Sequence, residues 1–563
     1  MALIGIDLGT TNSLVACWAE GEAKIIPNIL NENLTPSVVS IDTNGEILVG
    51  SVAKERLITH PELTCANFKR FMGTSKKFSL GNFTFSPEEL SSFILKTLKA
   101  DAEHFLGEEI SEAVISVPAY FSDAQRKATK LAGELAGLKV ERLISEPTAA
   151  AIAYGLHESA NDTQFLVFDL GGGTFDVSIL EMFEGIMEVK SIAGDNFLGG
   201  EDFNNVLASY FLNTNKLELK NLDKQTVSSL WKQAELCKKE LTNSQIGKMS
   251  LLIDGKDFET SINRYQFEKL CAELILRLRT PIIQALKDAN ISHDELDTVI
   301  LIGGSTRMTL VKQTVTKLFN KLPFANINPD ETVALGAAIQ AALKERNSDL
   351  NEIILTDVCP YTLGIATYNR NSNITNSSLL FSPIIERNTP IPISIEEPFV
   401  TIFDNQDSIK IKIYQGENRF VDNNIKLGEF EIPVPLSPAG KEVVLVRFTY
   451  DINGLLEVEA TVLNNGLKKS LLIENSPGSM TSEEIKERLK ELEKIKVHPR
   501  ENTKYKLILA RGERLYQESL GEYREQISLL LAKFESILET QNPKKIEKVA
   551  EEISKIFDEL ERY

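Results

Sequence analysis

The sequence has little from which a disulfide framework or a metal cluster could be built. Its 563 residues include five cysteines, an odd number with no Cys-x-x-Cys pair, and the five histidines are scattered. Neither a disulfide scaffold nor a zinc site is expected. No apolar run reaches the roughly 18–20 residues of a membrane-spanning helix. The first residues also lack a basic start and a cleavage signal. We therefore expect no membrane partner and a cytoplasmic location.

An excess of positive charge is also missing. The 61 Lys and Arg stand against 80 Asp and Glu, which gives a formal net charge of −19. A surface this acidic repels the phosphates of nucleic acids and anionic lipids, so no nucleic-acid partner is expected. Apolar residues make up 42% of the chain, enough for globular cores, and the length indicates about three to four domains.

Two patterns divide the first 478 residues. Within residues 1–346, short apolar runs such as 113–117 alternate with amphipathic stretches such as 122–138, which is typical of an α/β domain. Within residues 359–478 this helical period disappears. Residues 409–414 alternate strictly between apolar and polar, and the Asn-Gly pairs at 453–454 and 465–466 predict hairpin turns. This region is predicted to be an antiparallel β-domain.

The helical period returns in residues 479–563. Thr481 and Glu484 form a capping-box signature, and Asn542-Pro543 is a good start for a last helix. These helices are expected to pack on one another.

The linker, residues 347–358, holds three consecutive bulky apolar residues between carboxylates, unlike a passive Gly/Ser or Pro spacer. It is either a strand that completes one domain or a segment that docks in one state and is exposed in another.

Two similar turns carry the chemistry. A strand ends at Asp7 and leads into Gly9-Thr10-Thr11, and another ends at Asp169 and leads into the turn 171–174, GGGT. Each turn is followed by a further strand, so each predicts a hairpin and not the strand-to-helix turn of a Rossmann or P-loop site. Glycines let backbone N–H groups approach phosphate oxygens, threonines add donors, and the two carboxylates can hold hydrated Mg²⁺. The pair predicts two phosphate clamps that close from opposite sides.

A third glycine turn, GGSTR at residues 303–307, follows the strand 298–302. Small residues let a flat group lie against the backbone, and the Arg307 guanidinium stacks well on an aromatic ring. Beside two phosphate clamps, this turn predicts an adenosine pocket.

With these motifs in register, the sequence resembles the DnaK-type chaperones of the heat shock protein 70 family along nearly its whole length. The shortened C-terminal third is most similar to the bacterial HscC branch. The motifs that carry the resemblance are GIDLGTTNS (5–13), VPAYF (117–121), EPTAAA (146–151), FDLGGGTFD (168–176), LGGEDF (198–203), the turn at 303 and NPDE (328–331).

The resemblance implies an actin-like α/β nucleotide-binding domain of two lobes, then an antiparallel β-sandwich that binds peptide, then an α-helical lid. It also implies an ATP hydrolase that alternates between ATP and ADP with Mg²⁺ and K⁺. The implied catalytic residues are Lys69, Glu146, Asp7, Asp169 and Thr174, and Asp7, Asp169 and Asp176 would organise the metal ions and their waters. The implied nucleotide-binding residues are Gly9, Thr10, Thr11, Asn12, Gly171, Gly172, Gly173, Thr174, Gly199, Gly200, Glu201, Glu235, Lys238, Gly303, Gly304, Ser305, Arg307 and Asp330.

The family pattern also implies sites for partners. A groove for extended, unfolded polypeptide would be lined by Ile365, Phe399, Ile409 and Ile411, each of which is alternatively a sandwich core residue. Arg142 and Asp357 match positions that receive signals from a J-domain co-chaperone.

Several positions depart from the family pattern. Ser145 and Asn196-Phe197 replace the usual residues, Ile402-Phe403 is bulkier than usual beside the groove, and the segment 242–262 is short where exchange factors bind. The resemblance therefore leaves dependence on an exchange factor open. One alternative is an actin-fold metabolite kinase, which shares the two phosphate turns but leaves residues 359–563 without a role. A third possibility is an actin-like filament protein, which nucleotide-dependent sedimentation would test.

Overall fold

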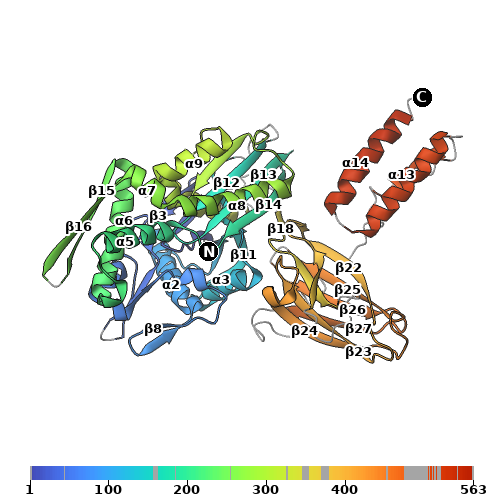
Figure 1. The fold of residues 1–563 in the computed structure, drawn as a ribbon, viewed down its shortest axis with the longest axis horizontal. Helices are drawn as coiled ribbons and strands as arrows, with labels where there is room; N and C mark the ends of the chain where they lie inside the picture. The colour runs from blue at the N-terminus through green and yellow to red at the C-terminus, as the bar shows by residue number, and fades with distance from the viewer. Residues whose placement is uncertain are drawn as a thin grey trace. The chain divides into compact units, whose positions relative to one another are not determined.

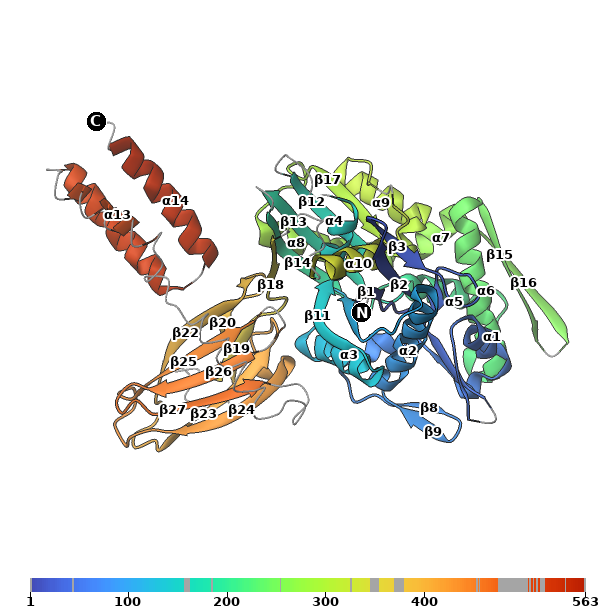
Figure 2. The same cartoon turned by 180° about the vertical axis from the view of Figure 1, so that it is seen from behind.

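The protein forms two compact units, Met1–Thr356 and Asp357–Tyr563 (Figures 1 and 2). The structure is a computed structural model. It describes residues 3–42, 45–155, 163–183, 186–253, 255–324, 327–344, 354–368, 379–451, 454 and 456–473, and near the C-terminus 505, 508–509, 511–512, 515–516, 522–541 and 543–560. The predicted cap at Thr481 and Glu484, the turn residue Asn453 and the first half of the linker lie outside these ranges.

The first unit contains two lobes, each with its own sheet and its own apolar core. The sheet of the first lobe has the order β11-β10-β1-β2-β3, with β4 beside β2. Its strands are β1 Leu3–Asp7, β2 Asn12–Ala19, β3 Glu22–Ile26, β4 Thr35–Pro36, β10 Glu112–Val117 and β11 Lys139–Ser145. β1 runs antiparallel to β2 and parallel to β10. Asp7 is the last residue of β1 and leads into the hairpin turn to β2.

The sheet of the second lobe repeats this plan. Its order is β17-β12-β13-β14-β18, with strands β12 Thr163–Leu170, β13 Phe175–Phe183, β14 Ile186–Asp195, β17 Thr298–Ile302 and β18 Ile354–Val358. β12 runs antiparallel to β13 and parallel to β17, as β1 does with β2 and β10. The two predicted hairpins are therefore confirmed, and they occupy equivalent places in the two sheets.

Helices cover both sheets. In the first lobe they are α1 Ser51–Thr59, α2 Pro87–Leu106, α3 Asp123–Leu135 and α4 Glu146–Ala153. In the second lobe they are α5 Gly200–Thr214, α6 Lys224–Asn243, α7 Arg264–Leu270, α8 Ala272–Ala289 and α9 Thr309–Phe319, and α10 Thr332–Lys344 packs against β1 and α4. A Cβ on Gly336 would lie 1.8 Å from the Ala149 carbonyl oxygen. Only glycine therefore lets α10 pack this closely on α4.

The first unit also contains shorter strands and hairpins. They are the strands β5 Val38–Ile41, β6 Ile47–Val49 and β7 Thr64–Ala66, the hairpin β8 Phe78–Leu80 with β9 Phe83–Phe85, and the hairpin β15 Ile246–Ile253 with β16 Lys256–Asn263. Short 3₁₀ turns include Phe68–Phe71 and Gly304–Arg307, which both carry predicted site residues.

The second unit contains a β-sandwich and a pair of helices. One sheet has the order β20-β19-β23-β24 and the other β22-β25-β26-β27, all antiparallel. The strands are β19 Leu363–Thr367, β20 Leu380–Ile385, β21 Pro390–Ile391, β22 Ile393–Val400, β23 Ser408–Gln415, β24 Ile425–Pro433, β25 Val443–Tyr450, β26 Leu456–Val462 and β27 Lys468–Ile473. Ile413 and Phe448, one from each sheet, belong to a single core. The predicted hairpins between β25, β26 and β27 are confirmed.

The helices α13 Glu522–Glu539 and α14 Pro543–Leu560 pack through a core that includes Phe534, Ile546 and Ile553. The start of the last helix at Pro543 is as predicted. Pro fits the first turn of a helix because the amide hydrogen it lacks would have no partner there.

The described part of the linker is a strand. Residues 354–356 run parallel to β14 and complete the sheet of the second lobe. Asp357 and Val358 continue into the second unit and pair with β21. The interpretation of the linker as a strand is therefore correct for this segment.

Candidate nucleotide and peptide sites

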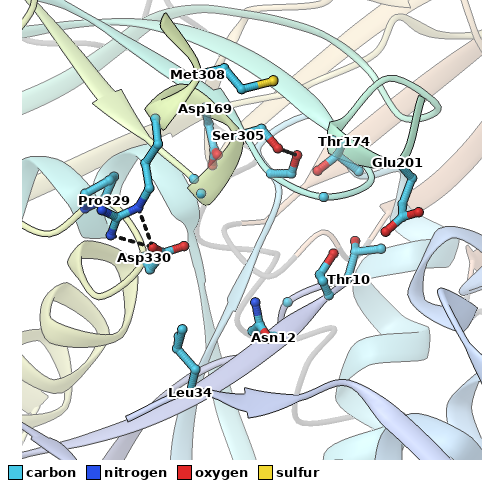
Figure 3. A pocket seen from close by; sticks show the side chains of 18 of the residues that line it. Thr10, Asn12, Leu34, Asp169, Thr174, Glu201, Ser305, Met308, Pro329 and Asp330 are labelled. Carbon is cyan, nitrogen blue, oxygen red and sulfur yellow. Dashed lines mark hydrogen bonds and ion pairs between the residues drawn. The ribbon is translucent and has the colours of Figure 1, made fainter. Parts of the chain in front are cut away.

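A cavity of about 510 Å³ lies between the two lobes of the first unit. Figure 3 shows Thr10 and Asn12 on one side of it, facing Asp169, Thr174 and Ser305 on the other. Most of the predicted residues line it: Asp7, Gly9, Thr10, Thr11, Asn12, Lys69, Glu146, Asp169, Gly171, Gly172, Thr174, Gly200, Glu201, Glu235, Lys238, Gly303, Gly304, Ser305, Arg307 and Asp330. These positions span more than 300 residues of sequence, and the two-lobed fold brings them together.

The two glycine turns touch each other across the cavity. A Cβ on Gly172 would lie 1.8 Å from the Thr11 hydroxyl oxygen, and one on Gly173 would lie 2.6 Å from Thr10 Cγ2. No other residue type fits between the turns without moving them. Gly199 lies behind them, where a Cβ would be 2.5 Å from the Gly172 carbonyl oxygen. Gly173 and Gly199 therefore shape the turns without lining the cavity.

Four acidic side chains lie close together here: Asp7, Asp169 and Glu146 line the cavity, and Asp176 is buried beside them without lining it. Burial, and after it the charge of Glu146, raises the pKa of Asp7 to about 7 and that of Asp176 to about 8. The pKa of Asp169 is also raised, first by burial and then by Glu146 and Asp176. These carboxyl groups repel one another in a desolvated place. A bound cation would allow all of them to ionise.

Lys69 supplies a positive charge beside these carboxylates. Its Nζ lies 3.1 Å from Glu146 Oε1, and both side chains are almost completely buried. Asp7 accepts a hydrogen bond of 2.8 Å from the Ser116 hydroxyl, and Asp176 accepts one of 3.1 Å from the Tyr120 N–H. These bonds fix the carboxylates in place.

The residues fit a hydrated Mg²⁺ better than a directly bound one. Among the described residues, no three His, Cys, Asp or Glu side chains are close enough together to hold a metal ion by themselves. Yet within that part of the chain Asp176 Oδ2 and the Thr11 hydroxyl are buried and have no hydrogen-bond partner. Such oxygens suit a metal held through water and through the phosphates of a nucleotide.

The third glycine turn forms the opposite end of the cavity. Arg307 pairs with Asp330 through Nη2 at 2.6 Å and Nε at 2.9 Å, and it also bonds to Asn328 (Figure 3). The Ser305 hydroxyl donates a 2.8 Å hydrogen bond to the Gly171 carbonyl, which ties this turn to the second phosphate turn. The Asp330 carboxylate thus fixes the position of the guanidinium, a group that stacks well on aromatic rings.

One face of helix α6 also lines this end of the cavity. Lys238 Nζ donates to the Gly200 carbonyl at 2.9 Å, and burial lowers its pKa. Glu235 pairs with Lys239 at 2.6 Å and lies 3.9 Å from Lys54.

Sequence reasoning missed some lining residues: Leu14, Leu34, Lys239, Thr242, Asn243, Met308, Pro329 and Val333. Helical periodicity offered a signal for Thr242 and Lys239, because they follow Lys238 and Glu235 by four residues on the same helix. Leu34 and Val333 carry no such signal.

A second cavity, of about 410 Å³, lies in the β-sandwich of the second unit. All four predicted groove residues line it. Ile365 and Ile411 are buried members of the sandwich core, whereas Phe399 and Ile409 are only partly buried. The floor of this groove is therefore core, and its walls are more exposed. Phe403, which the family pattern marked as unusually bulky, lies at its mouth with its ring centroid 6.4 Å from that of Tyr368.

The two predicted coupling residues lie in strands. Arg142 is half-buried in β11, opposite Val114 of β10. Asp357 lies in β18, where its carboxylate accepts a hydrogen bond of 2.8 Å from the Val358 N–H.

The family model described as Hsp70 protein matches residues 3–80 and 75–562, nearly the whole chain. The chain belongs to the Hsp70 family. Hsp70 proteins are ATP-dependent chaperones and ATPases that bind ATP or ADP with Mg²⁺, unfolded polypeptides and J-domain partners. The predicted family is thus confirmed. In this Hsp70, the described ranges contain no helix long and apolar enough to cross a membrane, and the cysteines in them form no disulfide.

Proposed function

We propose that this Hsp70 is a DnaK-type chaperone of the HscC branch that couples ATP hydrolysis to the binding and release of short hydrophobic segments of unfolded proteins. The observation that carries the proposal is the first cavity, where two glycine turns in mutual contact face a buried Lys69–Glu146 pair and a group of carboxylates. The domains would be an actin-like ATPase domain at 1–346, a linker at 347–358, a peptide-binding sandwich at 359–478 and a helical lid at 479–563.

The phosphates would lie between the two turns, which offer the backbone N–H groups and hydroxyls of Thr10, Thr11 and Thr174. Hydrolysis of a phosphoanhydride needs an aligned water and cations that stabilise the transition state. Lys69 would position the water and contribute its charge, and Glu146 would orient the ammonium group. Asp7, Asp169 and Asp176 would hold Mg²⁺ and K⁺ through water, and Mg²⁺ would neutralise charge on the phosphates.

The nucleoside would lie at the other end, with the base against Arg307 and the ribose beside Glu235 and Lys238. Asp330 would keep the guanidinium in plane. The second cavity would take an extended peptide, whose apolar side chain enters between Phe399 and Ile409 above the floor formed by Ile365 and Ile411.

Coupling would pass through β18. Residues 354–356 of this strand pair with β14 in the sheet of the second lobe. Asp357 and Val358 of the same strand pair with β21 of the second unit. Release of residues 354–356 from β14 would free the linker, and pairing of these residues with β14 would hold the linker in place. Arg142 and Asp357 would respond to a J-domain partner. The need for an exchange factor and the cytoplasmic location stay predictions.

A metabolite kinase or a filament protein would use the first cavity but not the second. The apolar groove in a separate β-sandwich favours the chaperone.

Steady-state ATPase activity tests the proposal, measured with and without a leucine-rich peptide on the wild type and on Asp357→Asn. We expect slow turnover that rises with peptide, and a rise that is lost in the variant. Asp404 lies on a loop beside the groove, where its carboxylate accepts a hydrogen bond from the Ala439 N–H. Asp404→Asn is the matched carboxylate control, and its turnover should still rise with peptide. Turnover that ignores peptide in every protein would contradict the coupling and leave only the nucleotide site.

A further inference from the structure

The strand that carries one wall of the groove has a free edge. β22 is the first strand of its sheet and pairs only with β25 in the described part of the sandwich. The N–H and C=O groups of alternate residues point away from β25 on such a strand. Pro398 lies two residues after Glu396, so the position of its missing N–H also faces away from β25. Proline is tolerated at such a place on an edge strand, because no ladder hydrogen bond is lost. A free edge is a place where another segment can bind.

One side chain occupies this edge. Gln541 lies in the turn between α13 and α14, 145 residues further along the chain. The Glu396 N–H donates to Gln541 Oε1 at 3.2 Å, and Gln541 Nε2 donates to the Glu396 carbonyl at 3.1 Å. The amide thus satisfies both outward backbone groups of one residue, as a neighbouring strand would. The Gln541 side chain is buried by this contact, with the whole residue only 9% exposed.

The turn is built to present this amide. Helix α13 ends as the Thr540 and Gln541 N–H groups donate to the carbonyls of Ile537 and Leu538. Gln541 itself has a φ of 51°, in the left-handed region that often ends helices. Glutamine is not favoured in this conformation, whereas glycine and asparagine are. Its side chain, rather than its backbone preference, therefore explains its presence there.

Glu396 is held on a second side as well. Its carboxylate pairs with Arg447 of β25 at 2.8 Å, so its backbone cannot turn away without breaking that ion pair. Three residues further along the same strand, Phe399 lines the groove, with Pro398 and Val400 beside it. Fixing β22 at Glu396 therefore fixes the wall of the groove.

We infer that Gln541 is a positioning residue that fastens the α13–α14 turn to the free edge of β22 and thereby slows the release of bound peptide. The inference rests on the proposed peptide groove. It assigns the helical pair a role through one strand edge, in addition to any covering of the groove.

The test uses the full chain with ADP and a fluorescein-labelled peptide with a leucine-rich centre. Gln541→Asn keeps the left-handed backbone favourable but is one methylene too short to reach both groups. We expect peptide release about tenfold faster, the equivalent of losing two modest hydrogen bonds. We also expect faster hydrogen exchange at the Glu396 amide. Gln541→Glu keeps the acceptor and loses the donor, so it should fall between Gln541→Asn and wild type.

Lys533→Ala is the matched control. It removes an exposed ion pair of 3.1 Å with Glu552 between the same two helices and leaves the β22 contact intact, so it should release peptide at the wild-type rate. Wild-type release and exchange in Gln541→Asn would overturn the inference, as would faster exchange with unchanged release. Absence of peptide binding by the wild type would instead refute the proposed groove itself, which separates the two failures.

Discussion

The two cavities of this Hsp70 are built in opposite ways. In the first unit, charged side chains from separate elements meet around backbone turns, and some form specific buried pairs, as Lys69 does with Glu146. In the second unit, the groove is formed by apolar side chains at alternate positions of neighbouring strands. A charged group that acts on a transition state has no substitute, whereas one of several apolar contacts can be partly replaced. Single substitutions should therefore have large effects in the first cavity and graded ones in the second.

The largest effect is expected for Lys69→Ala in the first cavity. We expect ATP to bind while single-turnover hydrolysis falls by roughly 10²–10³, as when one transition-state contact is removed. Because the partner carboxylate would remain buried without its cation, thermal unfolding should be recorded as well.

Lys232→Ala, which breaks an exposed ion pair with Glu55 on the surface of the same unit, is the matched control and should hydrolyse at the wild-type rate. Equal single-turnover rates in Lys69→Ala and wild type would remove Lys69 from the mechanism.

The groove should respond less steeply. Phe399→Ala removes a partly buried ring from its wall, and we expect peptide affinity to weaken about tenfold in fluorescence anisotropy titrations. Leu436→Ala removes an apolar side chain that is 66% exposed on the same unit and should bind peptide normally. If both variants bind as tightly as wild type, Phe399 is a core residue and not a peptide contact.

The carboxylates of the first cavity predict that the stability of the first unit depends on pH. The pKa values of Asp7 and Asp176 are raised from 3.8 to about 7 and about 8. The nucleotide-free protein then holds protons that the unfolded chain loses. This stabilisation is fully present below about pH 4 and is lost as the pH rises through 7 and 8.

We expect the Tm of the first unit to fall by a few degrees between pH 5 and 9, and the fall to be smaller in Asp176→Asn. Mg²⁺ with ADP should flatten it, because a cation stabilises the ionised carboxylates. Asp294→Asn, on an exposed loop of the same unit, should retain the wild-type slope. A slope identical in Asp176→Asn and wild type would contradict the burial of this charge.

Local motifs predicted the turns because their chemistry is written in consecutive residues. Asp7 is the last residue of β1 and Asp169 the last but one of β12, and glycines and threonines follow. The Lys69–Glu146 pair was reached only through family resemblance, because the two residues are 77 positions apart and each alone is an ordinary charged residue. Gln541 carried no signal at all. Its partners are backbone atoms of Glu396, and backbone atoms leave no trace in the residue types.

The smallest effect is expected at the nucleoside end, where the first cavity opens to solvent. The Arg307 side chain is 49% exposed, so its ion pair with Asp330 contributes little to stability. The contribution of Asp330 should instead be to orientation, since its carboxylate holds the guanidinium that we propose stacks on the base. We expect Asp330→Asn to weaken ADP binding by about threefold in calorimetric titrations, with an unchanged rate of hydrolysis once ATP is bound. Glu331→Gln, which alters the neighbouring carboxylate bonded to Asn33, should bind ADP as wild type does. A loss of hydrolysis equal to that of Lys69→Ala would contradict this division of the cavity into a part that orients and a part that reacts.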